Sequence, residues 1–401
     1  MGASTPTLTT PKVAWTVNVD GDIYGSPLIV GGHVIVATEN NSVYSLDIFT
    51  GTTIWQKNLG DPVDSSSLPC GNIKPITGIT GTPVADPATG RLYVVAYLRS
   101  HHHMLFALRL VDGSVVWQLD VDPPGSDPTV QQQRGALALG SGLVYVPFGG
   151  LLGDCGNYHG YVAAVRVAGG PPLVYRVPSG RMAGIWTPAG PTLDGEGNVY
   201  IVTGNGSGRS SFDYSNAVIE LSSDLQQVKS YFAPSNWVAL NDSDTDLGSV
   251  GATLIPPLGV VMVIGKDGVA YLLKAGQLGG VGGQITSEHV CSAAFGGTAW
   301  SGSTIFVPCT DGLYALSVTS TSIGVMWHVR HPAMASPIIA AGAVWAIDVL
   351  SGLLYALNPS SGEQLFSTGL GKVQHFGTPA AIEGFVVAPA ARSVVAVTTA
   401  A

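Results

Sequence analysis

A twelve-residue phrase that recurs along the chain constrains its fold more than any other feature. Residues 44–55 read YSLDIFTGTTIW, and the phrase returns at 106–117 as FALRLVDGSVVW and at 355–366 as YALNPSSGEQLF. Each copy begins with an aromatic residue, has Leu two positions later and Gly four positions before its end, and closes on an aromatic residue. This spacing predicts two short strands joined by a glycine turn, which is a β-hairpin. Because an isolated hairpin is only marginally stable, the copies must pack on one another.

The complete repeat unit is predicted to have four strands. The hairpin supplies the third and fourth, and a small residue followed by Ser or Thr and Pro introduces the first two at 25–27, 81–83, 335–337 and 377–379. The fourth strand of successive units is marked by an aromatic residue or its substitute, namely Trp55, Trp117, Tyr175, Tyr231, a position near Gln284, Trp327 and Phe366. An eighth unit is split, because residues 377–397 supply three strands and residues 12–15 supply the fourth.

Joining the two ends of the chain closes a ring and removes the free sheet edges that promote aggregation. The sequence therefore predicts an all-β fold, an eight-bladed β-propeller of four-stranded blades in which the N-terminal strand completes the C-terminal blade. Residues 12–401 form a single domain in this interpretation, and residues 1–11 are a disordered segment or linker. A seven-bladed ring is the alternative, because the fifth repeat, around residues 271–283, lacks the aromatic residue.

The composition agrees with a turn-rich β protein. Only 11% of the 401 residues are charged, against about a quarter in typical proteins, while 53 Gly and 26 Pro accompany 46% hydrophobic residues. The net charge of −9 is spread without basic or acidic runs, which argues against nucleic acid as a partner. No apolar stretch reaches the roughly 18 residues of a membrane-spanning helix. The first residues lack an export signal and resemble a linker that followed one.

Five long insertions fall in connections that emerge on one face of such a ring. They cover residues 61–78, 120–133, 147–160, 204–216 and 233–248. Long loops gathered on a rigid scaffold commonly carry the functional site, so a site is expected at the mouth of the central channel on this long-loop face. The triplet His101 to His103 is too short for a metal-binding tract and is expected in a loop.

The four cysteines can be paired by their places in the predicted blades. Cys70 and Cys155 both belong to the long-loop face, while Cys291 and Cys309 flank one predicted hairpin. We therefore predict the disulfides Cys70–Cys155 and Cys291–Cys309, which indicate an oxidising, extracytoplasmic compartment. Four free buried thiols in a cytosolic protein are the alternative. Metal binding by all four is unfavoured, because the chain has no CxxC pair.

Several polar and aromatic residues in these loops can carry chemistry. They are Asp154, His159, Trp186, Asn205, Asp242, Asp244, Asp246, Lys266 and Asp267. Converging carboxylate and amide oxygens suit a hard cation such as calcium, and a nearby carboxylate can act as a general base. An aromatic plane and a lysine suit a flat anionic ligand. Asn and Asp next to Gly are also common turn formers, which is the alternative role for Asn205.

The eight units and the phrase Tyr-x-Leu-Asp-x-x-Thr-Gly-x-x-x-Trp resemble the quinoprotein alcohol dehydrogenase-like propellers. Catalytic members of that family bind pyrroloquinoline quinone (PQQ) and calcium, whereas other members, including assembly factors of outer-membrane β-barrels, bind no quinone. The resemblance implies metal ligands at Asp154, Asn205 and Asp244, and cofactor contacts at Trp186, Lys266 and His159. It implies a catalytic carboxylate at Asp244 or Asp246.

The chain also departs from the catalytic members. It lacks their adjacent Cys-Cys pair and a Cys-x-x-Cys-His haem site, and His159 stands where the family has an Arg. Two functions follow. The first is an extracytoplasmic, non-catalytic scaffold or binding module whose long-loop face holds a protein, polysaccharide or small-molecule ligand. The alternative is a PQQ- and calcium-dependent alcohol or sugar dehydrogenase with its site at the channel mouth.

Overall fold

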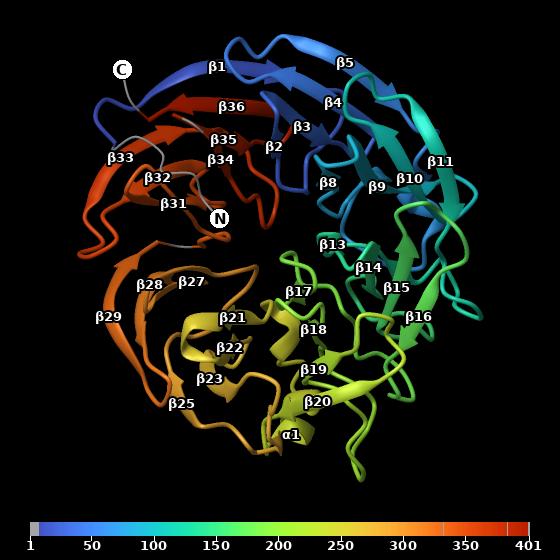
Figure 1. Cartoon of the computed structure of the whole chain (residues 1–401), viewed down its shortest axis with the longest axis vertical. Helices are drawn as coiled ribbons and strands as arrows, with labels where there is room; N and C mark the ends of the chain where they lie inside the picture. Colours follow the sequence, from blue (N-terminus) through green and yellow to red (C-terminus); the bar gives the residue numbers. More distant parts are fainter. Residues whose placement is uncertain (1–7, 332, 383, 400–401) are drawn as a thin grey trace.

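The chain forms a ring of eight β-sheets around a central axis (Figure 1). The computed structural model describes residues 8–331, 333–382 and 384–399. The eight sheets confirm the predicted all-β propeller and exclude the seven-bladed alternative.

Each blade is built on four antiparallel strands, ordered from the channel outwards, and the sheets of blades 3 and 4 each gain a fifth short strand, β12 (Gln131–Gln132) and β24 (Gly280–Val281). Blade 1 contains β2 (Leu28–Val30), β3 (His33–Ala37), β4 (Ser42–Asp47) and β5 (Thr53–Asn58), and blade 2 contains β8 (Val84–Asp86), β9 (Arg91–Leu98), β10 (His102–Arg109) and β11 (Val115–Asp120). Blade 3 contains β13 (Ala138–Gly140), β14 (Leu143–Gly150), β15 (Tyr161–Arg166) and β16 (Leu173–Arg176), and blade 4 contains β17 (Thr192–Leu193), β18 (Val199–Val202), β19 (Val218–Leu221) and β20 (Val228–Ala233).

The second half of the ring repeats the pattern. Blade 5 contains β21 (Thr253–Ile255), β22 (Val260–Ile264), β23 (Val269–Lys274) and β25 (Thr286–His289), and blade 6 contains β26 (Ala299–Ser301), β27 (Thr304–Cys309), β28 (Gly312–Val318) and β29 (Ile323–Arg330). Blade 7 contains β30 (Ile338–Ala340), β31 (Ala343–Asp348), β32 (Leu353–Leu357) and β33 (Gln364–Gly369), and blade 8 contains β34 (Ala380–Ile382), β35 (Phe385–Pro389), β36 (Ser393–Thr398) and β1 (Lys12–Asn18).

The two ends of the chain close the ring as predicted. Strand β1 pairs antiparallel with β36, from Lys12 opposite Thr398 to Asn18 opposite Ser393. Residues 1–7 of the predicted linker lie outside the described residues. Of the remainder, Leu8 and Thr9 donate backbone hydrogen bonds to blades 7 and 8. The domain boundary at residue 12 stays a prediction.

The hydrophobic core is divided among the blade interfaces. Eight clusters of buried side chains are found in the described residues, and each fills the space between two neighbouring sheets. Alternating strand residues point to opposite faces, so both faces of every inner strand can be covered by a neighbouring blade. Removing one blade would expose two cores, which is why the ring must close.

The closing tryptophan of the repeat docks one blade on the next. The indole nitrogen of Trp55 in blade 1 donates to the carbonyl oxygen of Leu110 in blade 2, at 2.9 Å. Its ring lies against Gly113, where an added Cβ would come within 2.6 Å of the indole, so the turn of the next repeat requires glycine. Trp15, Trp117 and Trp327 make the same bond to the next blade, at 2.8, 3.3 and 3.0 Å.

Irregular elements lie in the connection between blades 1 and 2 and in and around blades 3 to 5. They are β6 (Val63–Asp64), β7 (Ile76–Thr77), β12 (Gln131–Gln132), β24 (Gly280–Val281), α1 (Trp237–Asp242), and the 3₁₀ turns η1 (Ser65–Ser67), η2 (Leu247–Ser249) and η3 (Pro256–Leu258). The outer strand of blade 5 begins at Thr286, two residues beyond the position expected near Gln284, because β24 is inserted before it. No helix in the described part of the chain has the length and apolarity needed to cross a membrane.

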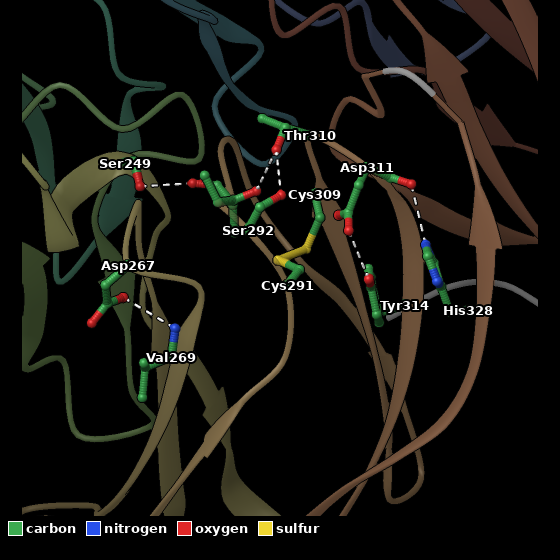
Figure 2. Close-up of a disulfide and its surroundings, with 12 residues drawn as sticks. Ser249, Asp267, Val269, Cys291, Ser292, Cys309, Thr310, Asp311, Tyr314 and His328 are labelled. Carbon is green, nitrogen blue, oxygen red and sulfur yellow. Dashed lines mark hydrogen bonds between the residues drawn. A yellow bond between two sulfur atoms is a disulfide. The ribbon is translucent and has the colours of Figure 1, made fainter.

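Both predicted disulfides are confirmed. Cys70–Cys155 joins the connection between blades 1 and 2 to a loop of blade 3, and Cys291–Cys309 joins the end of blade 5 to strand β27 of blade 6. Figure 2 shows the second bridge next to Thr310, whose backbone N–H donates to Ala293 at 2.9 Å. No free cysteine remains, so the alternative of four thiols is wrong.

The histidine triplet does not lie wholly in a loop, contrary to expectation. Only His101 occupies the turn between β9 and β10, whereas His102 and His103 begin strand β10. The hairpin continues regular pairing up to this point, with His102 opposite Leu98 and His103 opposite Tyr97.

Candidate functional site

The five predicted insertions meet at one cavity of about 550 Å³. Each insertion contributes at least one lining residue, in chain order Asn72, Gln132, Asp154, Asn205 and Asp244. Trp186, Asp246 and Lys266 also line it. The volume lies within the range of about 300–1,000 Å³ typical of small-molecule sites. The expectation that the long loops converge on one site is therefore supported by the placement of the cavity.

Asp246 is the buried carboxylate of this cavity. It follows the short helix α1, and its side chain is only 3% exposed. One carboxylate oxygen accepts the backbone N–H of Asn205 at 2.6 Å, and the other lies 2.5 Å from Nζ of Lys266. Burial raises the pKa of Asp246, and the ammonium of Lys266 opposes that shift without cancelling it.

Lys266 is held at the end of strand β22 by the same loop. Its backbone N–H donates to the carbonyl of Asp246 at 2.9 Å, and Nζ donates to the carbonyl of Asp244 at 3.1 Å. Burial lowers the pKa of Lys266, but its attraction to Asp246 and Asp244 outweighs this and raises the pKa overall. Lys266 is therefore a fixed positive charge, with Nζ 5.9 Å from the ring centre of Trp186.

Trp186 lies half-buried in the cavity wall, and glycine residues pack closely against its side chain. An added Cβ at Gly149 would come within 2.9 Å of the Trp186 side chain, and the same holds at Gly184. At Gly204 an added Cβ would come within 2.4 Å of an Asp246 oxygen. The Thr-Gly-Asn segment at 203–205 therefore needs glycine for the backbone of Asn205 to reach Asp246.

Asn205 presents an uncommitted side chain to the cavity. Its backbone N–H is bonded to Asp246 and its carbonyl accepts from Ala183 at 2.8 Å, which fixes the residue in place. The residue as a whole is 6% exposed and lines the cavity, and its side-chain amide forms no hydrogen bond to any residue that the structure describes. A turn-forming role alone would not require an unpaired amide at the wall of a cavity.

The other two predicted contacts differ from each other. Asp154 lines the cavity, where one of its oxygens accepts from the hydroxyl of Tyr158 at 2.5 Å. Burial raises the pKa of Tyr158 well above its ordinary value. His159 does not line the cavity, because its buried ring faces Arg176, whose Nη2 lies 2.9 Å from Nε2. Burial and then Arg176 lower the pKa of His159, so it is a neutral packing residue here.

The carboxylates of the cavity do not form a metal-binding cluster by themselves. The carboxylates of Asp154, Asp244 and Asp246 do not gather within 4.8 Å of one another, and Asp244 is exposed and bonded to Lys266. Calcium takes about six to eight oxygen ligands, so a cation here would need oxygens from a bound ligand as well. The metal assignment of Asp154, Asn205 and Asp244 stays a prediction.

Sequence reasoning missed Arg134, which brings a second positive charge to the cavity. Its guanidinium lies 4.7 Å from the ring centre of Phe376 and 5.6 Å from that of Tyr24, and among the described residues it has no ion-pair partner. Arg134, Tyr24 and Phe376 each precede an inner strand by four residues. Aligning the repeats at their inner strands would have found this channel-mouth position.

Comparisons with known proteins place the chain among propellers of contrasting roles. A family model described as outer membrane protein assembly factor BamB matches residues 7–74. No curated protein sequence matches the chain. The fold resembles that of the quinohaemoprotein alcohol dehydrogenase ADHIIG from Pseudomonas putida HK5, with a TM-score of 0.79 and 13% identity over 99% of this chain and 78% of that one.

Two further solved structures share the fold. A europium-containing methanol dehydrogenase has a TM-score of 0.74 and 14% identity over 96% of this chain and 93% of that one. BamB from Moraxella catarrhalis has a TM-score of 0.67 and 12% identity over 97% of this chain and 98% of that one. The fold is therefore that of the quinoprotein alcohol dehydrogenase-like, PQQ-like repeat propellers, as the sequence resemblance implied.

Proposed function

We propose that the cavity binds a planar anionic quinone of the PQQ class together with a hard cation, and that the chain is an alcohol or sugar dehydrogenase. The observation that carries the proposal is the buried pair of Asp246 and Lys266, set beside Trp186 and the uncommitted amide of Asn205. Structural ion pairs are common, but this one lines a cavity, where a perturbed carboxylate is a candidate catalytic group.

The lining residues fit such a group. The face of Trp186 offers a stacking surface, and Lys266 and Arg134 offer positive charge to an anionic ligand. Asn205 and Asp154 would supply oxygens to a hard cation, which prefers carboxylate and amide oxygens. Such a quinone supplies the electron sink for oxidation of a hydroxyl group.

Asp246 is the residue proposed to take the proton from the substrate hydroxyl. A general base works best when its pKa lies near the operating pH, and burial moves Asp246 in that direction. Lys266 keeps Asp246 in place and limits the rise of its pKa. Asp244, the other catalytic candidate, is exposed and bonded to Lys266, so it is the weaker choice.

The pair gives the proposed reaction a pH dependence of defined sign. Only ionised Asp246 can accept a proton, so kcat/KM falls as the pH drops through its raised pKa. Lys266→Gln removes the charge that lowers this pKa. The acidic limb of the pH profile should therefore move to higher pH in the variant; a limb that stays in place or moves to lower pH would contradict the role of Lys266.

A non-catalytic scaffold or binding module is the second candidate. The BamB family-model match and the near-equal coverage of this chain and BamB favour it, as does the missing Cys-Cys pair. In this case the long-loop face would hold a protein or a polysaccharide. Both candidates place the chain outside the cytoplasm, and the two disulfides support that location.

Reconstitution separates the two candidates. Purified protein is incubated with PQQ and calcium, and thermal melting and dye-linked oxidation of a panel of alcohols and sugars are measured. The dehydrogenase proposal predicts a higher melting temperature, because a ligand that binds only the folded state stabilises it, and substrate-dependent dye reduction. Unchanged melting without dye reduction would refute it and leave the scaffold as the function.

A further inference from the structure

The start of strand β10 carries a cluster of titratable side chains that the proposed function does not use. Nδ1 of His102 lies 2.8 Å from Oδ2 of Asp120 and 3.0 Å from Oδ2 of Asp122. Asp120 ends strand β11 and Asp122 follows it, so the hairpin of blade 2 brings all three residues together. Their three ligand atoms lie within 4.8 Å of one another.

One proton on His102 does not serve both carboxylates. An imidazole nitrogen carries at most one proton, and ionised carboxylates only accept hydrogen bonds. One N–H at His102 therefore faces two acceptors at hydrogen-bond distance, and it bonds to Asp122, so the oxygen of the half-exposed Asp120 is left to water or to a cation. A cation placed between the nitrogen and the two oxygens would be attracted by all three atoms.

Both carboxylates are also held in position from behind. The oxygen of Asp122 that does not face His102, Oδ1, accepts from Nδ1 of His103 at 2.7 Å. The ring of His103 is buried and stacked on the ring of Tyr97, with 4.1 Å between the ring centres. The oxygen of Asp120 that does not face His102, Oδ1, accepts a hydrogen bond from the backbone N–H of Asp122 at 2.9 Å. Each carboxylate thus has one anchored oxygen and turns the other toward His102. Outer hydrogen bonds of this kind orient the ligands of protein metal sites.

We propose that His102, Asp120 and Asp122 bind a divalent transition-metal ion of the Zn²⁺ type. One imidazole nitrogen and two carboxylate oxygens are ligands that Zn²⁺ accepts at about 2.0–2.2 Å. The side chains of His102 and Asp120 are 49% and 46% exposed, which leaves room for water to complete the coordination. A nitrogen ligand disfavours calcium, which prefers oxygen.

The site is separate from the cavity but adjoins a loop that lines it. None of the three proposed ligands lines the cavity. The neighbouring His101 contacts Ser67, with 2.9 Å between its Nε2 and the hydroxyl oxygen, and Ser67 belongs to the insertion that carries Cys70 and Asn72. Metal binding would therefore brace the hairpin beside that loop, and it can be tested without reference to quinone binding.

The test is calorimetric titration of tag-free, chelator-treated protein with ZnCl₂. The wild-type chain should bind one ion at this site and melt at a higher temperature in its presence. His102→Ala and Asp120→Asn should each weaken that binding by roughly tenfold or more and remove the thermal shift. Both side chains are half-exposed, so the folded state should survive, and circular dichroism checks this.

His101→Asn is the matched control within the same triplet. His101 contacts Ser67 rather than the carboxylates, and asparagine tolerates its left-handed backbone at φ +60°. Zinc binding should be unchanged in this variant. The proposal is overturned if the wild-type chain binds no zinc, if binding survives in His102→Ala, or if CaCl₂ binds more tightly than ZnCl₂ at these residues. In those cases the cluster is an ion pair only.

Discussion

Neighbouring blades pack together in two different ways. Some interfaces are closed by a docked tryptophan, whereas those beside the cavity are not. Where the repeat is intact, as between blades 1 and 2, Trp55 reaches over Gly113 and bonds to the next blade. The outer strands of blades 3, 4 and 5 have no tryptophan that closes the interface with the following blade in this way. Those interfaces instead contain longer loops, added elements and the Cys291–Cys309 bridge.

The difference shows where a repeat protein can place chemistry. A docked tryptophan requires a glycine turn of fixed shape, so little variation is tolerated there. Where that contact is absent, stability comes from other packing, such as Trp237 of α1 in the core between blades 3 and 4. The connections are then free to carry Asp246, Lys266 and Asn205 into the cavity.

The largest effect should come from removing the carboxylate of the cavity. Asp246→Asn keeps an acceptor for the N–H of Asn205 but cannot take a proton, so turnover of the reconstituted protein should fall by roughly 10²–10⁴-fold. Asp242→Asn is the matched control, because Asp242 is exposed and pairs with Arg209. Steady-state kinetics should show an unchanged control; equal losses in both variants would show a loop defect instead.

The two disulfides should differ in what they stabilise. Loop-closure entropy predicts roughly 4–5 kcal/mol for Cys70–Cys155, which closes 85 residues, and roughly 3 kcal/mol for Cys291–Cys309, which closes 18. Each disulfide is removed by changing both of its cysteines to serine, and urea unfolding of the two variants measures the loss in free energy of unfolding. The Cys70/Cys155 variant should also lose PQQ-dependent stabilisation, because its loops line the cavity. Retained ligand stabilisation in that variant would contradict the link.

A buried carboxylate among the intact repeats gives a pH test. Burial raises the pKa of Glu39 from 4.5 to about 7, and one of its oxygens has no hydrogen-bond partner. The folded state therefore holds the proton more tightly than the unfolded state, and stability is lost as the pH rises from about 4.5 to 7. The loss above pH 7 should amount to about 3 kcal/mol at most.

Glu39→Gln should remove this loss. Its stability relative to the wild-type chain, from urea unfolding at pH 5 and pH 8, should improve at the higher pH. Exposed Glu288→Gln is the control and should show no such change. A Glu39→Gln difference that is the same at both pH values would mean that Glu39 titrates normally.

The smallest effect should come from the docking bond itself. Trp55→Phe leaves the carbonyl of Leu110 without its indole donor and should cost about 1–3 kcal/mol in the free energy of unfolding. Trp300→Phe is the control, because Trp300 is 37% exposed and closes no blade interface. In thermal melting, only the Trp55→Phe variant should have a lower melting temperature than the wild-type chain. Equal melting temperatures would show that the intact interfaces do not depend on this bond.

The ring could be predicted from sequence because its determinants repeat. Aromatic and glycine positions recur at fixed spacing, so the blades, the ring closure and both disulfide pairs followed. Part of the cavity lining could also be predicted, because the segments that depart from the repeat contain Asp154, Trp186, Asn205, Asp246 and Lys266.

Other features depend on approaches between distant segments. Sequence spacing could not show that His159 turns away to Arg176, because its ring is drawn into the packing of strand β16. Arg134 was missed because its place, four residues before the inner strand β13, is recognised only when the repeats are aligned at their inner strands. The pairing of His102 with Asp120 and Asp122 likewise depends on the register of β10 and β11.

Direct titration of PQQ into calcium-saturated protein tests the central claim. This claim is that the cavity, lined by loops that depart from the repeat, is a quinone site. The wild-type chain should bind one equivalent. Trp186→Ala should weaken binding by roughly tenfold or more, because base–aromatic stacking of comparable size is worth about 1–3 kcal/mol, while Trp300→Ala binds as the wild type does. Absence of saturable binding, or equal binding by both variants, would contradict the claim.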